Sequence, residues 1–169
     1  MARRPQVSPA ITPAQLADLD QIMEIERLSF PSPWARQVFL EEFDRDFAYL
    51  EVIRGGPNGR VVAFINYWVV HDEIHVLNVA THPDWRRQGL ARVLMKHVLR
   101  SARVLGSQLV TLEVRRTNDA AITLYTMLGF LPVGVRPRYY ENDEDAIVMV
   151  LKLPPPTHPE KRQMPRGGR

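Results

Sequence analysis

Apolar residues recur along the chain with two different periods, and these periods predict which segments are helices and which are strands. A spacing of three to four residues is typical of an amphipathic helix, whereas short runs rich in β-branched and aromatic residues are typical of strands. The first pattern predicts four helices, at residues 13–28, 33–43, 90–105 and 119–128. The second predicts strands near 7–11 and at 47–54, 61–70, 74–81, 108–114, 130–140 and 146–153.

Residues suited to helix ends mark several of these boundaries. Thr12 is a candidate N-cap for the first helix, with Pro13 at its first position. Ser32 and Pro33 have the same roles before the second helix, and Gly106 is placed to end the long third helix. We therefore expect the helices to begin and end at these positions.

The expected order of elements is β-α-α-β-β-β-α-β-α-β-β. Its middle part, β-α-β-α-β, predicts a parallel pair of strands joined by a crossover helix. The class is α/β, and the sequence contains no internal repeat.

Length and composition indicate one domain. The 169 residues contain 45% hydrophobic residues, which is ordinary for a globular protein, and no apolar run is long enough for a membrane span. The N-terminus lacks the apolar segment of a signal peptide. Because the chain has no cysteine, disulfides, thiolate metal sites and a cysteine nucleophile are excluded, and a cytoplasmic location is expected.

The positive charge of the chain is concentrated at its C-terminal end. We expect a flexible N-terminus at 1–10, a domain at 11–153 and a disordered, proline-rich basic tail at 154–169. The tail holds four basic residues against one acidic residue, which accounts for the whole net charge of +3. A basic nucleic-acid-binding body is therefore not supported. The tail either contacts ribosomal RNA or another polyanion, or is simply solvated.

The turn before the long helix is the strongest chemical signal. Residues 86–91 read Arg-Arg-Gln-Gly-Leu-Ala. A helix N-terminus presents unpaired N–H groups and the positive end of the helix dipole, and Gly89 has no side chain to keep an anion away. Arg86, Arg87 and Arg92 add positive charge. The turn predicts a pyrophosphate site for a nucleotide-bearing cofactor, with an ordinary arginine-rich surface turn as the alternative.

The spacing of this turn differs from two common phosphate-binding motifs. A Walker A loop requires a Lys-Ser or Lys-Thr pair, which the chain lacks, and a dinucleotide fingerprint requires three spaced glycines. The pattern Arg86-x-x-Gly89-x-Ala91 instead resembles the coenzyme A pyrophosphate loop of the GNAT acyltransferase superfamily.

Two further residues suggest acid–base chemistry. Glu113 is the only acidic residue of an apolar strand, and a carboxylate beside apolar side chains can have a raised pKa and act as a general base. The alternative is a solvent-facing or arginine-paired glutamate, because Leu112 and Val114 point to the opposite face. Tyr125 has the spacing of a core residue, so packing is its alternative role.

Residues 112–121, Leu-Glu-Val-Arg-Arg-Thr-Asn-Asp-Ala-Ala, are followed by Leu124-Tyr125 and 128–130, Leu-Gly-Phe. This string resembles bacterial ribosomal-protein-alanine N-acetyltransferases, the RimI-like type of GNAT enzyme. The later segments 138–140, Arg-Tyr-Tyr, and 144–146, Glu-Asp-Ala, resemble the same family. The resemblance runs from about residue 11 to 153. It implies a GNAT fold, with a mixed, mostly antiparallel sheet of about six or seven strands, a central parallel pair and about four flanking helices.

The resemblance also implies the donor and the site residues. Acetyl-CoA would be the acetyl donor, Glu113 would accept the amine proton through water, and Tyr125 would protonate the leaving thiolate. Strand backbone would hold the pantetheine arm and the turn would hold the pyrophosphate. The implied cofactor-binding residues are Val79, Ala80, Thr81, Arg86, Arg87, Gln88, Gly89, Leu90, Ala91, Arg92 and Asn118. Ala91 stands where glycine is commoner, and Thr81 where an aliphatic residue is usual.

Aromatic residues outside this set are candidates for the acceptor site. Phe30, Trp34, Tyr139 and Tyr140 could line a peptide groove by the same resemblance, with ordinary packing as the alternative. The five histidines match no common zinc spacing, and no metal is expected.

The leading hypothesis is an acetyl-CoA-dependent enzyme that acetylates the N-terminal alanine of a small-subunit ribosomal protein. A protein N-terminal acetyltransferase of broader specificity and a small-amine acetyltransferase are alternatives. A non-catalytic CoA-binding module is the third, and the joint presence of Glu113 and Tyr125 argues against it. The sequence does not determine the acceptor or the oligomeric state.

Overall fold

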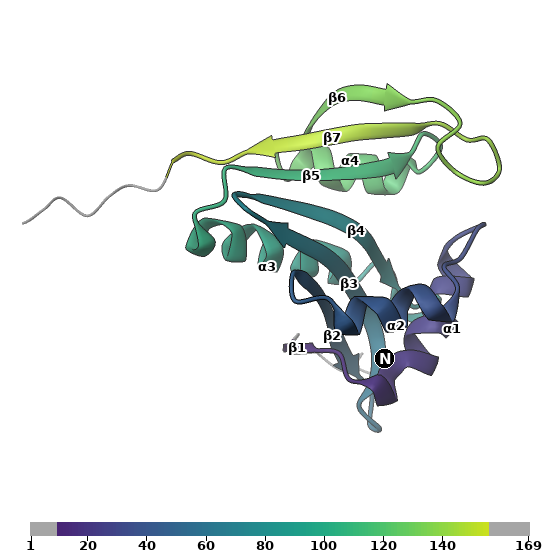
Figure 1. Cartoon of the computed structure of the whole chain (residues 1–169). Coiled ribbons are helices and arrows are strands. Elements are labelled where there is room, and N and C mark those ends of the chain that lie inside the picture. Colours follow the sequence, from purple (N-terminus) through teal and green to yellow (C-terminus); the bar gives the residue numbers. More distant parts are fainter. Residues whose placement is uncertain (1–9, 156–169) are drawn as a thin grey trace, which may run out of the picture.

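A seven-stranded sheet forms the centre of the computed structural model, which describes residues 10–155 (Figure 1). The strand order is β1-β2-β3-β4-β5-β7-β6, and every neighbouring pair is antiparallel except β4 and β5. The strands are β1 (Ile11–Pro13), β2 (Ala48–Gly55), β3 (Arg60–Val70), β4 (Glu73–Thr81), β5 (Leu109–Arg115), β6 (Leu131–Arg136) and β7 (Ala146–Lys152). The predicted fold class, including the central parallel pair, is confirmed.

Four α-helices and two short 3-10 helices accompany the sheet within the described residues. The α-helices are α1 (Leu19–Ser29), α2 (Arg36–Asp44), α3 (Leu90–Leu105) and α4 (Asp119–Met127), and the 3-10 helices are η1 (Leu16–Asp18) and η2 (Pro83–Trp85). The predicted order of strands and α-helices is also confirmed. No helix among residues 10–155 is long and apolar enough to cross a membrane.

Two apolar cores lie on opposite faces of the sheet. One is built with α1 and α2, and the other with α3 and with Tyr125 of α4. Adjacent residues of β3 alternate between them: Phe64 packs in the first core and Ile65 in the second, both fully buried. This two-sided burial explains why β3 is a nearly continuous apolar run in the sequence.

The parallel pairing of β4 with β5 stops partway along both strands. It joins Glu73 to Leu109 and ends where Val76 meets Leu112. At the same level β4 has a bulge, because Asn66 of β3 pairs with Asn78 while the next residue, Tyr67, pairs with Val76. A bulge bends its strand and turns the following side chains. The C-terminal half of β4 therefore separates from β5 (Figure 1), and the backbone groups along this edge of β4 have no partner in β5.

Two predicted helix starts are wrong. Thr12 and Pro13 belong to strand β1, which pairs with β2, and the chain enters α1 only after η1. Ser32 and Pro33 lie in the connection, and α2 begins at Arg36 after the extended residue Ala35. In the first case, pairing with β2 outweighs the local capping signal.

Strand β6 is shorter than the predicted 130–140. It ends at Arg136, and Arg138 has a left-handed backbone with φ of 48° that turns the chain away from the sheet. The strand predicted near 7–11 lies mostly outside the described residues, as do the N-terminal segment and most of the proline-rich tail.

Candidate active site

A cavity of about 740 Å³ opens where β4 and β5 separate. Its volume lies within the roughly 300–1,000 Å³ typical of small-molecule sites. Side chains from α1, the α1–α2 connection, β4, the start of α3, β5 and α4 line it, so both halves of the sheet contribute. The interrupted parallel pairing is therefore what creates the site.

The turn between η2 and α3 forms one end of this cavity. Arg87 and Gly89 both have left-handed backbones, with φ of 60° and 77°. A left-handed conformation is costly for arginine, and strain of this kind is typically found at functional sites. Alternating backbone conformations direct successive N–H groups into one concavity, which is suited to an anion. A Cβ added at Gly89 would meet no atom within 4 Å, so the approach to this concavity is open.

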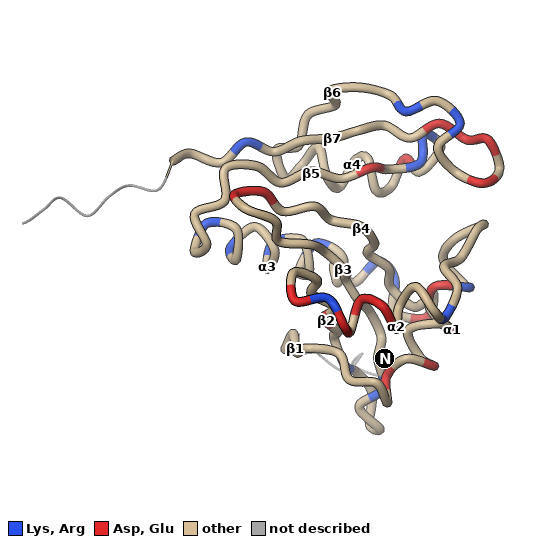
Figure 2. The backbone as a smooth tube through the Cα atoms, in the orientation of Figure 1, with Lys and Arg blue, Asp and Glu red and all other residues tan. Residues whose placement is uncertain are grey.

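Helix α3 strengthens the positive potential of this turn. It carries arginine or lysine at four exposed positions and no acidic residue, and Figure 2 shows the basic residues along it. Its N-terminal end, with the unpaired N–H groups of its first turn, faces the cavity through Leu90 and Ala91. An anionic ligand is therefore favoured here.

The guanidinium of Arg86 is used within the fold. It donates to the Thr81 carbonyl (3.1 Å), to the Ser29 hydroxyl (3.1 Å) and to the Leu28 carbonyl (3.4 Å). These bonds tie the end of α1 to the end of β4. Its charge still contributes to the potential of the turn, but its Nε and one of its two terminal nitrogens are already engaged.

The edge of β4 that is not paired with β5 and the start of α4 form the part of the cavity wall between the turn and the base of the cavity. Val79, Ala80 and Thr81 belong to the part of β4 that has no pairing with β5. Within the described residues, the buried Thr81 hydroxyl has no hydrogen-bond partner. Asn118 caps α4, because its side-chain oxygen accepts the Ala121 N–H at 3.2 Å. Its amide nitrogen is the group left to meet a ligand.

Glu113 lies on the cavity wall formed by β5, in a charged environment. His75 Nε2 is 2.6 Å from its Oε2, and an Arg136 guanidinium nitrogen is 3.4 Å from its Oε1. The hydrogen bond to His75, opposed by burial and assisted by the charge of Arg136, lowers the pKa of Glu113. The prediction that apolar neighbours raise this pKa is wrong, because His75 approaches from the adjacent strand.

Tyr125 lies on α4 and lines the same cavity. Its side chain is buried, and its ring centre lies 5.9 Å from that of Phe130. Burial is the larger cause, and the nearby Tyr140 the smaller cause, of the raised pKa of its hydroxyl. The phenol therefore stays protonated at neutral pH and has a proton to give. It also serves the core, since its ring belongs to the apolar cluster under α3.

The connection between β6 and β7 brings Tyr140 to the cavity. The guanidinium of Arg115 lies 3.9 Å from the centre of the Tyr140 ring and donates to Glu144 at 3.0 Å. Hydrogen bonds lower the pKa of the Glu144 carboxyl to about 2, and those from Thr117 contribute more than the one from Arg115. This ionised carboxylate anchors the acidic turn visible in Figure 2 and holds Tyr140 in place.

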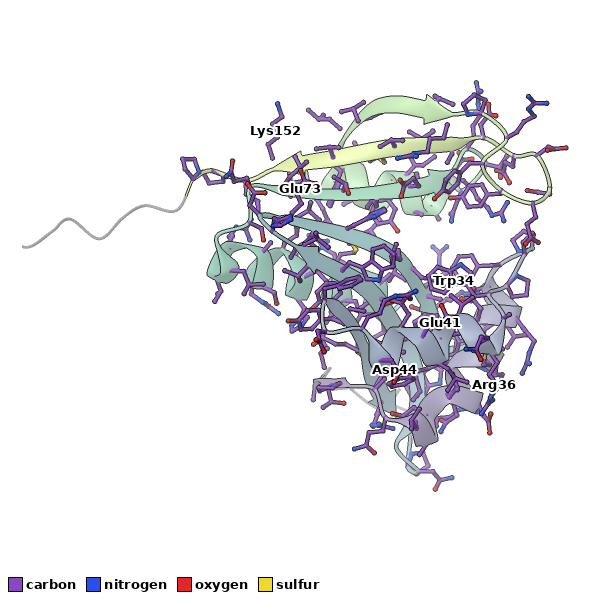
Figure 3. All side chains as sticks on the ribbon, viewed as in Figure 1. Trp34, Arg36, Glu41, Asp44, Glu73 and Lys152 are labelled. Atoms are coloured by element: carbon purple, nitrogen blue, oxygen red, sulfur yellow. The ribbon has the colours of Figure 1, made fainter. Side chains whose placement is uncertain are left out.

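A second glutamate, Glu26 of α1, lines the opposite wall. It is buried, and it accepts the Trp34 N–H at 2.9 Å and the Asn78 amide at 2.7 Å. Burial, partly offset by these two bonds, raises the pKa of Glu26. The carboxylate thus fixes Trp34, which Figure 3 labels beside the α1–α2 connection, relative to β4. Phe30 lines the cavity from the same connection.

The structure brings most of the predicted site residues together. Both predicted catalytic residues line the cavity, as do all the predicted cofactor-binding residues except Gln88 and all the predicted acceptor-site residues except Tyr139. Gln88 lies in the turn, and Tyr139 packs edge-on against Tyr140 at 5.1 Å. Sequence reasoning missed Glu26, Asn78 and His75. Residues 10–155 contain no cluster of three or more potential metal ligands from His, Cys, Asp and Glu.

Comparisons with known proteins agree with this arrangement. The model of the acetyltransferase (GNAT) family matches residues 19–130. The [ribosomal protein bS18]-alanine N-acetyltransferase of Escherichia coli K12 is 34% identical over 146 residues, which cover 85% of this chain and 97% of that protein. An N-alpha-acetyltransferase of Sulfurisphaera tokodaii is 33% identical over 156 residues, covering 83% and 90%.

A solved structure is similar over nearly the whole fold. The crystal structure of the ribosomal-protein-S18-alanine N-acetyltransferase from Escherichia coli has a TM-score of 0.78 and 33% identity, covering 90% of this chain and 97% of that one. The family match covers about two thirds of the chain, and each of these relatives is matched over at least 90% of its own length. The chain belongs to the acetyltransferase (GNAT) family.

Proposed function

We propose that this chain transfers an acetyl group from acetyl-CoA to the N-terminal α-amine of a ribosomal protein that begins with alanine, of the bS18 type. The observation that carries the proposal is the open edge of β4, that is, the edge that has no pairing with β5. It follows the cavity from the level of Glu113 in β5 to the left-handed turn before α3. The names of the relatives from Escherichia coli support the acceptor.

The cavity suits the parts of acetyl-CoA one by one. The N–H groups around Arg87 and Gly89 would bind the pyrophosphate. The backbone groups of the segment from Val79 to Thr81 that face away from β3 and have no partner in β5 would bond the pantetheine arm as a neighbouring strand does. The free amide nitrogen of Asn118 would add one donor. The thioester would then lie near the β4 bulge, between Glu113 and Tyr125.

Transfer would proceed by direct attack, since the chain has no cysteine to carry the acetyl group. The amine nitrogen bonds to the thioester carbon, the C–S bond breaks, and β4 N–H groups stabilise the oxyanion. Glu113 takes the amine proton through water, and Tyr125 gives its proton to the departing sulfur. An α-amine titrates near 7.7–8.0, so a substantial neutral fraction exists at neutral pH and a weak base suffices.

The acceptor would enter between the α1–α2 connection and the β6–β7 connection. Tyr140, which lines the cavity, and its neighbour Tyr139 would bond the first peptide carbonyls, while Phe30 and Trp34 would limit the first side chain to a small one. The amine of an internal lysine lies at the end of its side chain, away from the peptide carbonyls that these tyrosines would bind. We accordingly assign an α-amine acceptor, and place the reaction in the cytoplasm, where ribosomal proteins are made.

A peptide panel tests this assignment. Peptides that begin with alanine, serine or methionine, and one with a blocked N-terminus and an internal lysine, are incubated with acetyl-CoA and the acetyl group is located by mass spectrometry. We expect acetylation of the alanine α-amine, weaker reaction with serine and little with lysine. Equal turnover of all free N-termini would support the broader enzyme, and acetylation of lysine or polyamines would contradict the proposal.

Donor binding is tested separately with two matched glycines. Gly89 and Gly59 both have positive φ and open space around an added Cβ, but only Gly89 lines the cavity. Gly89→Glu adds bulk and negative charge at the proposed pyrophosphate site, so calorimetry should show acetyl-CoA affinity collapsing. Gly59→Glu should retain it. Equal acetyl-CoA affinity in both variants would overturn the assignment of the turn around Gly89 as the pyrophosphate site.

A further inference from the structure

His75 lies beside Glu113 because of the register of the parallel strands. It pairs with Thr111, so the side chain of Glu113, two residues further along β5, emerges on the same face. His75 Nε2 and Glu113 Oε2 are 2.6 Å apart, and the two side chains are 32% and 10% exposed. The histidine therefore reaches solvent, while the glutamate faces the cavity.

The other charged and titratable groups around this pair are few. Arg136 of β6 is 3.4 Å from the second carboxylate oxygen. Burial, with the charge of Glu113 adding to it, raises the pKa of the Tyr139 and Tyr140 hydroxyls. On the α2 side, the ring of Trp68 meets His75 edge-on at 6.3 Å, and its indole N–H donates to Glu42 at 2.7 Å. Arg45 pairs with Glu42 and lies over the Trp68 ring. The only carboxylate hydrogen-bonded to the His75 ring, among the described residues, is that of Glu113.

The position of the shared proton follows from chemistry. Two acceptors at 2.6 Å repel, so one proton lies between Nε2 and Oε2. An ionised carboxylate can only accept, whereas a neutral imidazole donates from one nitrogen and accepts at the other. An ionised Glu113 therefore requires the proton on Nε2.

We propose that His75 is a positioning residue for Glu113: its Nε2–H holds one carboxylate oxygen, so that the other faces the acceptor amine or its bridging water. This inference rests on the proposed base role of Glu113.

Three variants separate this role from packing. In His75→Leu the donor is lost, and kcat/KM should fall tenfold or more, within the roughly 10²–10⁴-fold contribution of a general base. In His75→Gln the amide can donate from about the position of Nε2, so most of the rate should return, and a loss as large as that of His75→Leu would overturn the proposal. His97→Gln is the matched control, since His97 also bonds a glutamate at 2.9 Å, but that glutamate, Glu51, does not line the cavity as Glu113 does. It should keep the wild-type rate.

A double-mutant cycle shows whether His75 acts through Glu113. In a Glu113→Gln background, His75→Leu should cost no further rate. An equal loss in both backgrounds would mean that His75 acts elsewhere, and the inference would fail. If Glu113→Gln itself kept the wild-type kcat, the base assignment within the proposed function would fail instead, so the two failures are distinguishable.

Discussion

The two walls of the cavity each present one glutamate, in opposite electrostatic settings. On the α1–β4 wall, Glu26 is buried among neutral donors, the Trp34 N–H and the Asn78 amide, and burial raises its pKa. On the β5 wall, Glu113 meets a histidine and an arginine, and its pKa is lowered. The same side chain therefore has two different protonation behaviours across one cavity.

The difference indicates two separate roles. A carboxylate that must accept a proton during catalysis has to be ionised beforehand, and Glu113 meets this condition. Glu26 is held by hydrogen bonds that join the α1–α2 connection to β4, and its environment favours the neutral form. Environment assigns different tasks to paired carboxylates in many enzymes.

The largest expected effect is on the rate. Glu113→Gln should lower kcat by about 10²–10⁴-fold, the usual contribution of a general base, with acetyl-CoA affinity retained. Glu26→Gln should change kcat far less, because this carboxylate positions the acceptor connection. Steady-state kinetics at neutral pH measure both. If the two variants lose the same rate, the assignment of separate roles is wrong.

The next effect is on stability. Asn78→Leu removes one of the two donors to the buried Glu26 carboxylate, which should cost about 1–3 kcal/mol of the free energy of unfolding. His75→Leu leaves Glu113 at the edge of the cavity, where water can replace the lost donor, and should cost less. Urea denaturation of both variants gives the comparison. A larger loss in His75→Leu would contradict the burial argument.

The pH dependence of stability should separate Glu26 from its glutamine variant. Because the folded state raises the Glu26 pKa, its favourable contribution is present below the ordinary carboxyl pKa and is lost as the pH rises through the folded value. The stability of the wild type relative to Glu26→Gln should therefore fall as the pH rises from about 4. Thermal unfolding across this range measures it, and a rising difference would contradict the sign.

The smallest effect should come from Arg136. Its side chain is 57% exposed, and an exposed ion pair is typically worth about 0–1 kcal/mol. Arg136→Ala should thus change kcat/KM by at most about fivefold, and the change should shrink at high salt because screening weakens exposed pairs. Rates at two ionic strengths test this. A salt-independent loss as large as that of His75→Leu would show that Arg136, rather than His75, controls the base.

The fold was largely predictable because its longest elements carry strong local signals. The helix at 90–105 has regular apolar spacing and a left-handed glycine, Gly106, at its C-terminal end. The boundaries of α1 and α2 were not predictable in this way. Thr12 and Pro13 carry the local signal of a helix start, yet pairing of β1 with β2 places them in a strand.

The candidate site was predictable only where its residues are close in sequence. The turn at 86–91 and the 112–121 string are contiguous, whereas His75 and Glu113 are 38 residues apart and Glu26 and Asn78 are 52 apart. The β4 bulge, which precedes Asn78, includes no glycine that would signal it, and the contact of His75 with Glu113 follows from the parallel register of β4 and β5. The lowered pKa of Glu113 depends on that register, so residue type alone suggested the opposite shift.

The central claim is that the cavity shifts the pKa of its two glutamates in opposite directions, that of Glu113 down and that of Glu26 up. Carbon-13 NMR of the glutamate side-chain carboxyls, assigned with Glu26→Gln and Glu113→Gln, follows each titration directly. We expect Glu113 to titrate below the ordinary glutamate pKa of about 4.3, and Glu26 above it. Indistinguishable titrations, or a higher value for Glu113 than for Glu26, would contradict the claim.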